Sequence, residues 1–332
     1  MRFIKTLFLL FFIALLAGAG VLAAFAWSPL SLRTPVVDFS IRAGSGLRSA
    51  ARQMSEAGLG FAPWQFELLA RLLGQEAKIK AGSYEARSGL TPLALLDKLT
   101  RGDVTQTEVV FIEGWTFRQI RAALDAHPEL RHDSAGLSER EILTRLGAQE
   151  TSGEGLFFPD TYLAAKGSSD LDVLRRSYRL MSARLNDEWQ KRAPGLPLAT
   201  PYEALILASI VEKETGLAAD RPKIASVFIN RLRLGMRLQS DPTVIYGLGE
   251  RFDGNLRKAD LLADTPYNSY TRAGLPPTPI AAPSLASIQA VLAPPQTPYL
   301  YFVARGDGSS VFSRSLDEHN RAVDRYQRRH GG

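Results

Sequence analysis

The residues best placed for chemistry are two glutamates, Glu212 and Glu214, which end an apolar run. At helical spacing Glu214 falls on the same face as three apolar residues at positions i, i+3 and i+4, namely Leu207, Ile210 and Val211. That face is expected to pack into a core, and burial raises the pKa of a carboxyl. The partial negative charge of a helix C-terminus acts in the same direction. A carboxyl that stays protonated near neutral pH can act as the general acid that cleaves a glycosidic bond.

A plainer interpretation of this segment stays open, in which it is a polar helix end with two surface glutamates. Glu212 lies two residues before Glu214, which is about 200° around a helix of 3.6 residues per turn. It therefore points elsewhere, and the two carboxyls are not expected to act as a pair.

The composition excludes several classes of protein. With 332 residues, of which 45% are hydrophobic and 22% charged, the chain can bury one large core or two smaller ones. The net charge of +6 favours an anionic partner. No basic run with interleaved aromatic residues occurs, so nucleic acid is not expected as a partner. The absence of cysteine excludes disulfides and thiolate nucleophiles. The histidines lack the spacing of metal ligands, and neither a P-loop nor a nucleophile elbow is present.

The N-terminus predicts a membrane anchor. Residues 7–27 form an uninterrupted uncharged run, long enough to cross a bilayer core as a helix. Arg2 and Lys5 precede it within a short tail, residues 1–6, and the next basic residue is Arg33. Positive charge on the short side predicts that this end is cytoplasmic and that the rest of the chain lies outside.

A cleaved signal peptide is the competing interpretation of the same run. Ala24-Phe25-Ala26 offers an A-x-A cleavage site, although the apolar core of a signal peptide is usually shorter than this one. Residues 28–35, with two prolines, read as a linker.

Residues 36–104 are predicted to form a small module. Two strand-like segments, 36–41 and 81–85, enclose two helical patterns. Such a βααβ order resembles the LysM fold, a small glycan-binding module, and a plain α+β spacer is the alternative. Residues 105–154 are interpreted as a connecting region.

Two later segments could line a groove. The aromatic residues of 155–162 fit either a sugar cleft or a core, and the proline-rich loop 267–280 offers Asn and Tyr side chains for hydrogen bonding and stacking. Asp241, with Pro242 after it, fits the N-cap and first position of a helix. The same carboxyl is also a candidate catalytic group.

Taken together, these blocks resemble the endolytic murein transglycosylase family (MltG, YceG-like). The resemblance rests on long blocks in the right order: Ile210–Thr215, Ala225–Leu232, Met236–Tyr246, Tyr267–Tyr270, Gly274–Pro277, Phe158–Thr161 and Tyr299–Val303. It runs from the anchor to the C-terminal helix. The serine of Gln239-Ser240-Asp241 is interpreted as a tolerated variant of its motif.

The resemblance implies an α+β enzyme with an N-terminal transmembrane helix, a LysM-like module and a mixed α/β catalytic domain, residues 155–330. Such enzymes are anchored in the bacterial inner membrane, with the catalytic domain in the periplasm. They cut nascent peptidoglycan glycan strands between N-acetylmuramic acid and N-acetylglucosamine without water, and so end strand elongation. The family's catalytic glutamate maps onto Glu214. The expected partners are peptidoglycan strands, the inner membrane and, as candidates, peptidoglycan synthases, and no metal or organic cofactor is implied.

Six residues are predicted to line the groove around Glu214: Gln239, Asp241, Tyr246, Asn268, Tyr270 and Asn320. Two other functions stay open at this point. A muramidase would use Asp241 to activate water and would leave reducing ends. A noncatalytic scaffold would hold glycan through the LysM-like module and would not need Glu214.

Overall fold

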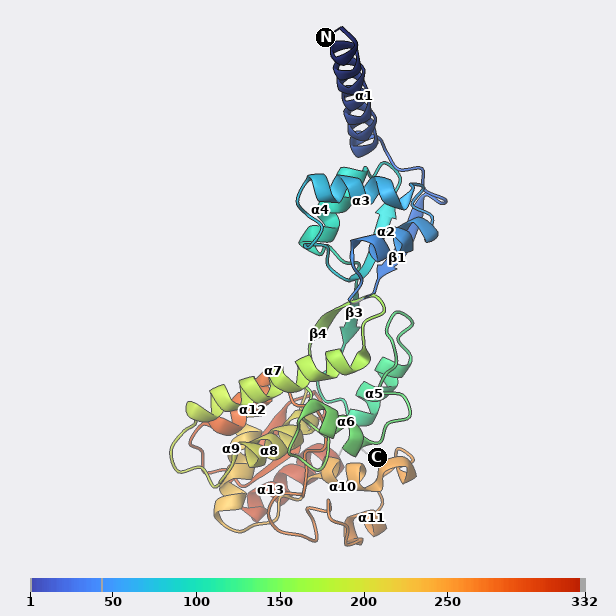
Figure 1. Ribbon diagram of the computed structural model, residues 1–332. Coiled ribbons are helices and arrows are strands. Elements are labelled where there is room, and N and C mark those ends of the chain that lie inside the picture. Colours follow the sequence, from blue (N-terminus) through green and yellow to red (C-terminus); the bar gives the residue numbers. More distant parts are fainter. Residues whose placement is uncertain (1, 43, 329–332) are drawn as a thin grey trace. The chain divides into compact units, whose positions relative to one another are not determined.

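The computed structural model shows a mixed α/β protein and describes residues 2–42 and 44–328 (Figure 1). The outer ends of the predicted tail, 1–6, and of the predicted catalytic domain, 155–330, lie outside the described residues. The chain divides into two compact units that do not follow chain order. Unit 1 comprises residues 1–108, 129–131 and 163–168, and unit 2 comprises residues 109–128, 132–162 and 169–332.

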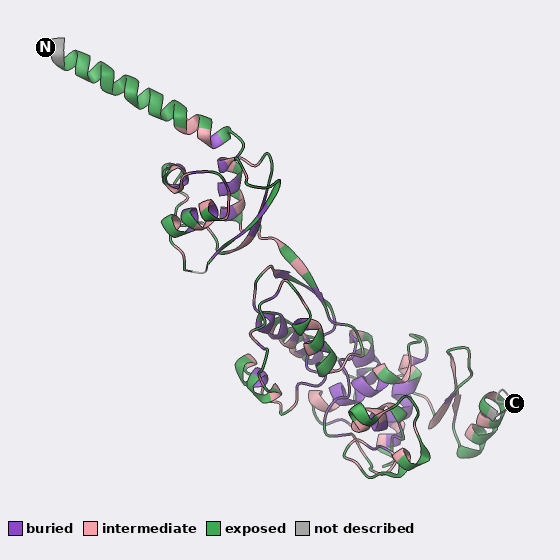
Figure 2. Cartoon of the chain, turned by 90° about the vertical axis from the view of Figure 1, so that its right-hand side faces the viewer, coloured by how far each residue is buried: buried purple, intermediate pink, exposed green. Residues whose placement is uncertain are grey.

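Unit 1 begins with helix α1 (Arg2–Trp27). The helix is long and apolar enough to cross a membrane from Ile4 to Trp27, and it is exposed over most of its length (Figure 2). Only its last turns are covered, where Ala26 joins the core of the unit. One such helix is consistent with single-pass membrane anchoring.

The rest of unit 1 follows the order strand, helix, helix, strand, helix. Alternate residues of β1, namely Val37, Phe39 and Ile41, are buried, as expected for a strand with one face on a core. Thr91 caps the last helix, because its hydroxyl accepts a hydrogen bond from the backbone of Ala94. The likeness to LysM stays a prediction. The bounds are β1 Val36–Ile41, α2 Leu47–Glu56, α3 Pro63–Leu72, β2 Gly82–Arg87 and α4 Pro92–Arg101, with β1 antiparallel to β2.

Unit 2 is mainly helical around α8 (Pro201–Glu214). Residues 204–211 of this helix are all buried, which explains why its sequence is apolar on every face. The other elements are α5 Phe117–Asp125, α6 Glu139–Leu146, α7 Asp170–Gln190, α9 Arg221–Arg233, α10 Asp241–Leu248, the 3-10 turn Gly249–Arg251, α11 Lys258–Leu262, α12 Leu285–Leu292, β5 Tyr301–Ala304, β6 Ser310–Ser313, α13 Leu316–Val323 and a π-helical turn Asp324–Arg328. Strand β5 is antiparallel to β6, and β3 (Gln106–Val110) pairs with β4 (Thr161–Ala165).

The structure tests two local predictions, one for segment 155–162 and one for Asp241. The aromatic segment 155–162 packs in the core, since Phe157 is fully buried and stacks on Phe117 at 5.0 Å between ring centroids. The prediction of Asp241 as an N-cap is wrong by one residue, because α10 begins at Asp241 and Ser240 is the N-cap. Ser240 makes no side-chain cap, since its hydroxyl points to another partner.

Candidate active site

Helix α8 carries Glu214 at its last position. The helix starts after Thr200, whose hydroxyl accepts a hydrogen bond from the backbone of Glu203, and Pro201 occupies the first turn. It stops because Thr215 takes an extended conformation, with φ −150° and ψ 135°. Glu214 is therefore only partly buried, at the negative end of a helix that is otherwise embedded in the core.

The carboxyl of Glu214 meets one hydroxyl. Ser240 donates a hydrogen bond to Oε1 at 2.5 Å, and within the described chain it is the only donor to this carboxyl. Burial raises the pKa of Glu214 to about 7, against the opposing effect of the Ser240 hydrogen bond. The group therefore changes between acid and carboxylate near neutral pH, as a proton-transfer group must.

A cluster of buried hydroxyls fixes Ser240. The backbone N–H of Ser240 donates to the Ser269 hydroxyl at 2.9 Å, and that hydroxyl lies 2.8 Å from the hydroxyl of Thr243. The Thr243 hydroxyl donates in turn to the backbone carbonyl of Ser240 at 2.7 Å. All three residues are buried. The backbone of Ser240, whose hydroxyl contacts Glu214, is thus held by hydrogen bonds to two buried hydroxyls.

Two charges of opposite sign act on Glu214. The Asp241 carboxylate raises its pKa and the Arg231 guanidinium lowers it, both less than burial does. Arg231 is buried, donates from Nε to the carbonyl of Leu300 and from Nη1 to that of Leu238, each at 2.7 Å, and lies over the ring of Tyr301. Because carbonyls and a ring hold this cation, it stays near the site without forming an ion pair there.

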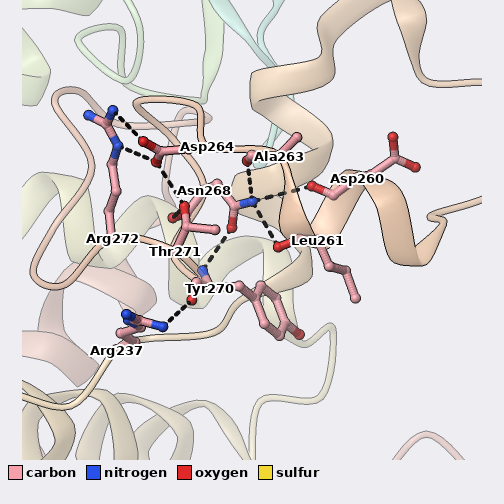
Figure 3. A network of polar contacts seen from close by, with 9 residues as sticks. All are labelled: Arg237, Asp260, Leu261, Ala263, Asp264, Asn268, Tyr270, Thr271 and Arg272. Atoms are coloured by element: carbon pink, nitrogen blue, oxygen red, sulfur yellow. Dashed lines mark hydrogen bonds and ion pairs between the residues drawn. The ribbon is translucent and has the colours of Figure 1, made fainter.

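The predicted groove residue Tyr270 does come close to Asp241. Its hydroxyl donates to Oδ1 of Asp241 at 2.6 Å. The loop that presents it is held by Asn268, whose amide donates to three backbone carbonyls, those of Asp260, Leu261 and Ala263, and accepts from the backbone of Tyr270 (Figure 3). Asn268 is 1% exposed, so in this structure it shapes the loop and does not offer its amide to a ligand.

Gln239 and Asn320 occupy different surroundings. Gln239 is exposed and precedes Ser240 with φ +50°, a left-handed conformation that is costly for a residue with a side chain. A hydrogen bond from its backbone N–H to the carbonyl of Ser269 stabilises Gln239 in this conformation. Asn320 is exposed on α13, next to His319, whose ring stacks on Tyr301.

Tyr246 points to a second acid that the sequence analysis did not single out. Its hydroxyl donates to Oε2 of Glu154 at 3.1 Å, while Oε1 accepts from the backbone of Phe117, also at 3.1 Å. Glu154 is 4% exposed, and burial raises its pKa to about 7. The available signal was its position directly before the aromatic segment 155–162.

Glu154 lines a cavity of about 650 Å³. Next to it, Gly155 has φ +75°, and a Cβ there would lie 2.5 Å from Pro279, so only glycine allows this approach to the proline-rich loop. A second cavity of about 480 Å³ shares Glu154 and Tyr246 as part of its wall. The larger cavity is lined by Thr116, Arg118, Glu154, Lys213, Pro242, Ile245, Tyr246, Gly249, Tyr267 and Ile280.

Glu212 is neither a surface residue nor a partner of Glu214. Its Oε2 accepts hydrogen bonds from the backbone and hydroxyl of Ser284 and from the hydroxyl of Ser287, and Arg221 lies 4.0 Å from Oε1. It therefore holds the first turn of α12 against α8. Among the described residues, no cluster of three or more His, Asp or Glu side chains is arranged to hold a metal ion.

Comparisons with known proteins agree on one family. The model of the YceG-like family matches residues 39–325. An endolytic murein transglycosylase of Bacillus subtilis (strain 168) is 30% identical over 315 residues, which are 87% of this chain and 84% of that protein. One from Streptococcus pneumoniae serotype 2 is 27% identical, and the chain spans 58% of its length. A crystal structure of a yceG-like protein from Listeria monocytogenes, 29% identical, covers 86% of this chain with a TM-score of 0.55.

Proposed function

The chain belongs to the YceG-like family, and on that premise we propose that Glu214 is the acid and base with which it cuts peptidoglycan. The enzyme is an endolytic lytic transglycosylase. It cleaves the β-1,4 bond between N-acetylmuramic acid and N-acetylglucosamine inside glycan strands, without water, and leaves 1,6-anhydro ends. The observation that supports the role of Glu214 is its carboxyl, whose pKa is raised to about 7 and which accepts a hydrogen bond from one described residue, Ser240.

The proposed reaction uses this one carboxyl twice. Protonated Glu214 gives its proton to the glycosidic oxygen as the bond to C1 breaks. The resulting carboxylate then removes the proton of the C6 hydroxyl of the same muramic residue, and that oxygen bonds to C1. The nucleophile belongs to the substrate, so a second carboxylate that activates water, as in ordinary glycosidases, is not needed. Acid–base catalysis of this kind contributes roughly 10²–10⁴-fold.

Two neighbours of Glu214, Ser240 and Asp241, have opposite effects on its protonation. Ser240 orients the carboxyl and stabilises its charged form, which is the form left after the first proton transfer. Asp241 acts in the opposite sense and helps Glu214 keep its proton in the resting enzyme. Burial is the main cause of the pKa near 7, and these two smaller effects oppose each other. At this pKa both protonation states are accessible near neutral pH.

We assign the cavity beside Glu154 as the place where a sugar next to the cleaved bond binds. Its lining includes Lys213, the residue before Glu214, and two tyrosines, Tyr246 and Tyr267, whose rings lie 4.8 Å apart. A volume of about 650 Å³ is within the range of ligand sites. Aromatic faces and a few polar groups suit a carbohydrate ring.

The proposed location follows from the anchor. We place α1 in the bacterial inner membrane as a single-pass helix with the N-terminus in the cytoplasm and both units in the periplasm, because Arg2 and Lys5 precede the uncharged run 7–27. There the enzyme would end the elongation of nascent strands close to the synthases that make them.

Mass spectrometry of reaction products tests this proposal. Full-length wild type, Glu214→Gln and a matched control at an exposed glutamate, Glu76→Gln, are incubated with uncrosslinked glycan strands. Internal fragments with 1,6-anhydro ends are expected from the wild type and the control only. Reducing ends would identify a muramidase that uses a second carboxylate such as Asp241. Equal cleavage by Glu214→Gln would remove this residue from the chemistry, and no cleavage by any of the three would favour a scaffold.

A further inference from the structure

Helix α3 carries an uncovered apolar row on its outer face. Trp64, Leu68 and Leu72 are spaced four residues apart, so they follow one another along one side of the helix. Their exposed fractions are 61%, 40% and 65%. The opposite side already fills the core of unit 1 with Phe66 and Ala70, both fully buried. A helix that is apolar on both sides needs a second apolar environment.

The row lies beside the end of the membrane helix. Helices α1 and α3 are in contact, and α3 runs crosswise to α1 at the end of the module nearest to α1 (Figure 1). Leu22 and Phe25 of α1 pack against the core of the module, and the Phe25 ring meets that of Phe61 at 6.3 Å. These contacts lie within unit 1. They fix the position of α3 along the axis of α1, next to the last turns of α1.

The length of α1 indicates how deep in a bilayer the contact between α1 and the module lies. Coverage of α1 by the module begins at Leu22, and the uncharged exposed part before it is residues 6–21. Sixteen residues of helix rise about 24 Å, somewhat less than the roughly 30 Å of a hydrocarbon core. When Lys5 lies at the inner headgroups, Leu22 and the part of the module that touches it therefore lie at the outer edge of the hydrocarbon, next to the headgroup region. Trp27, 66% exposed, then lies in that headgroup region, where tryptophan is enriched in membrane proteins.

We propose that Trp64, Leu68 and Leu72 of α3 form a membrane-docking face that inserts into the headgroup region of the same bilayer that α1 crosses. Tryptophan and leucine on the buried side are typical of helices that lie in the membrane surface. The long side chains of Arg48 and Arg71, 69% and 58% exposed, lie at the edge of this face around Glu67. They can bury their stems and reach lipid phosphates. The module would thus be held at two points, which limits how unit 1 can turn about its anchor.

Depth-resolved fluorescence quenching tests this face in the intact protein. The chain has no cysteine, so Leu72→Cys gives one labelling site in the face and Ser40→Cys gives a matched exposed site on β1. Ser40 pairs with Ser83 near one end of the two-stranded sheet β1–β2. The linker from α1 enters at the other end of that sheet, at Val36. Each full-length variant carries an environment-sensitive dye and is reconstituted in vesicles of zwitterionic and anionic phospholipid. Quenchers are either attached to lipid headgroups or dissolved as iodide.

The expected result is a reversal between the two sites. The label at position 72 should lose most of its emission to the lipid-borne quencher and be shielded from iodide, while the label at position 40 should respond to iodide alone. Equal iodide quenching at both positions would overturn the proposal. Shielding of position 72 from iodide without quenching by lipid would also overturn it, since another protein surface would then cover the row. Neither site touches the catalytic residues, so glycan cleavage should be unchanged in both variants.

Discussion

Two acids of unit 2 have similarly raised pKa values but different surroundings. Burial raises the pKa of both Glu214 and Glu154 to about 7. Both oxygens of Glu154 accept a hydrogen bond, one from Phe117 and one from Tyr246, and the residue is 4% exposed. Within the described part of the chain, Glu214 accepts a hydrogen bond only from Ser240, and the residue is partly exposed. A raised pKa therefore does not separate the two acids by itself, and our proposal for Glu214 rests in addition on its partly exposed carboxyl.

Glu212 extends this comparison along one helix. It lies two residues before Glu214, yet it accepts three hydrogen bonds on Oε2 from the first turn of α12. Because two residues span about 200° of a helix, the two side chains point in different directions. Glu212 links α8 to α12, whereas Glu214 faces the candidate site. Glu212 thus has a structural role and Glu154 lines the cavity, which leaves Glu214 as the acid that we propose for proton transfer.

The largest expected effect separates the two acids by activity. Glu214→Gln keeps an acceptor for Ser240 but cannot donate a proton, so the single-turnover rate should fall by roughly 10²–10⁴-fold. Glu154→Gln keeps both hydrogen bonds, because its amide oxygen can accept from Phe117 and the Tyr246 hydroxyl can turn to accept from its NH₂. Its loss should stay within about tenfold, or ~1.4 kcal/mol. Rates on the same glycan strands, measured with enzyme in excess, check both values.

The opposite ranking would break the comparison. If Glu154→Gln lost as much rate as Glu214→Gln, the catalytic acid would be Glu154 or a pair of the two. Tyr246→Phe is the control, since it removes one donor to Glu154 without touching the Glu214 hydroxyl cluster. We expect it to behave like Glu154→Gln.

The pH dependence is the next test, because both acids titrate in the same range. Glu214 must be protonated in the first step, so the wild-type rate should fall above pH 7, by about tenfold for each pH unit well past the pKa. Glu154→Gln should keep this limb. If the limb disappeared in Glu154→Gln, the titration of Glu154 would control the wild-type rate, and the assignment of Glu214 would be contradicted. Single-turnover rates between pH 5 and pH 9 decide between these outcomes.

The same pKa values predict a smaller effect on stability. A carboxyl whose pKa rises from 4.5 to about 7 on folding stabilises the native state fully below pH 4.5, and this contribution is lost as pH rises through 7. For Glu154 the loss should be roughly 1–3 kcal/mol. The measured quantity is the denaturant midpoint of Glu154→Gln minus that of the wild type. This difference should be more favourable to the variant at pH 8 than at pH 4.5. An unchanged difference between the two pH values would show that Glu154 is not desolvated.

The sequence predicted the helix of Glu214 because one periodic pattern sufficed. Apolar residues at helical spacing placed Leu207 and Val211 in the core, and both are fully buried. Capping chemistry is equally local, as at Thr91, whose hydroxyl caps the helix that begins at Pro92. Such features depend on neighbours within a few residues, which the sequence displays directly.

Partners distant in the chain were not predictable in this way. Glu154 meets Tyr246, 92 positions later, and Ser240 meets Glu214, 26 positions earlier. Nothing in either local pattern indicates such a pairing. Asn268 was predicted at the groove from its residue type alone, but three carbonyls that its own loop brings together occupy its amide.

Ser240 gives the smallest expected effect and the sharpest test of the hydroxyl cluster. The sequence suggested a tolerated variant of its motif, yet its hydroxyl is the one donor to Glu214 among the described residues. That hydrogen bond lowers the pKa of Glu214, so Ser240→Ala should move the fall in rate above pH 7 to higher pH, by about one unit. The rate on the plateau should fall only a few-fold, because the proton donor remains. Thr243→Val, which alters the cluster without touching Glu214, should shift the limb less. A limb that stays in place in Ser240→Ala would mean that this hydrogen bond positions the carboxyl without setting its protonation.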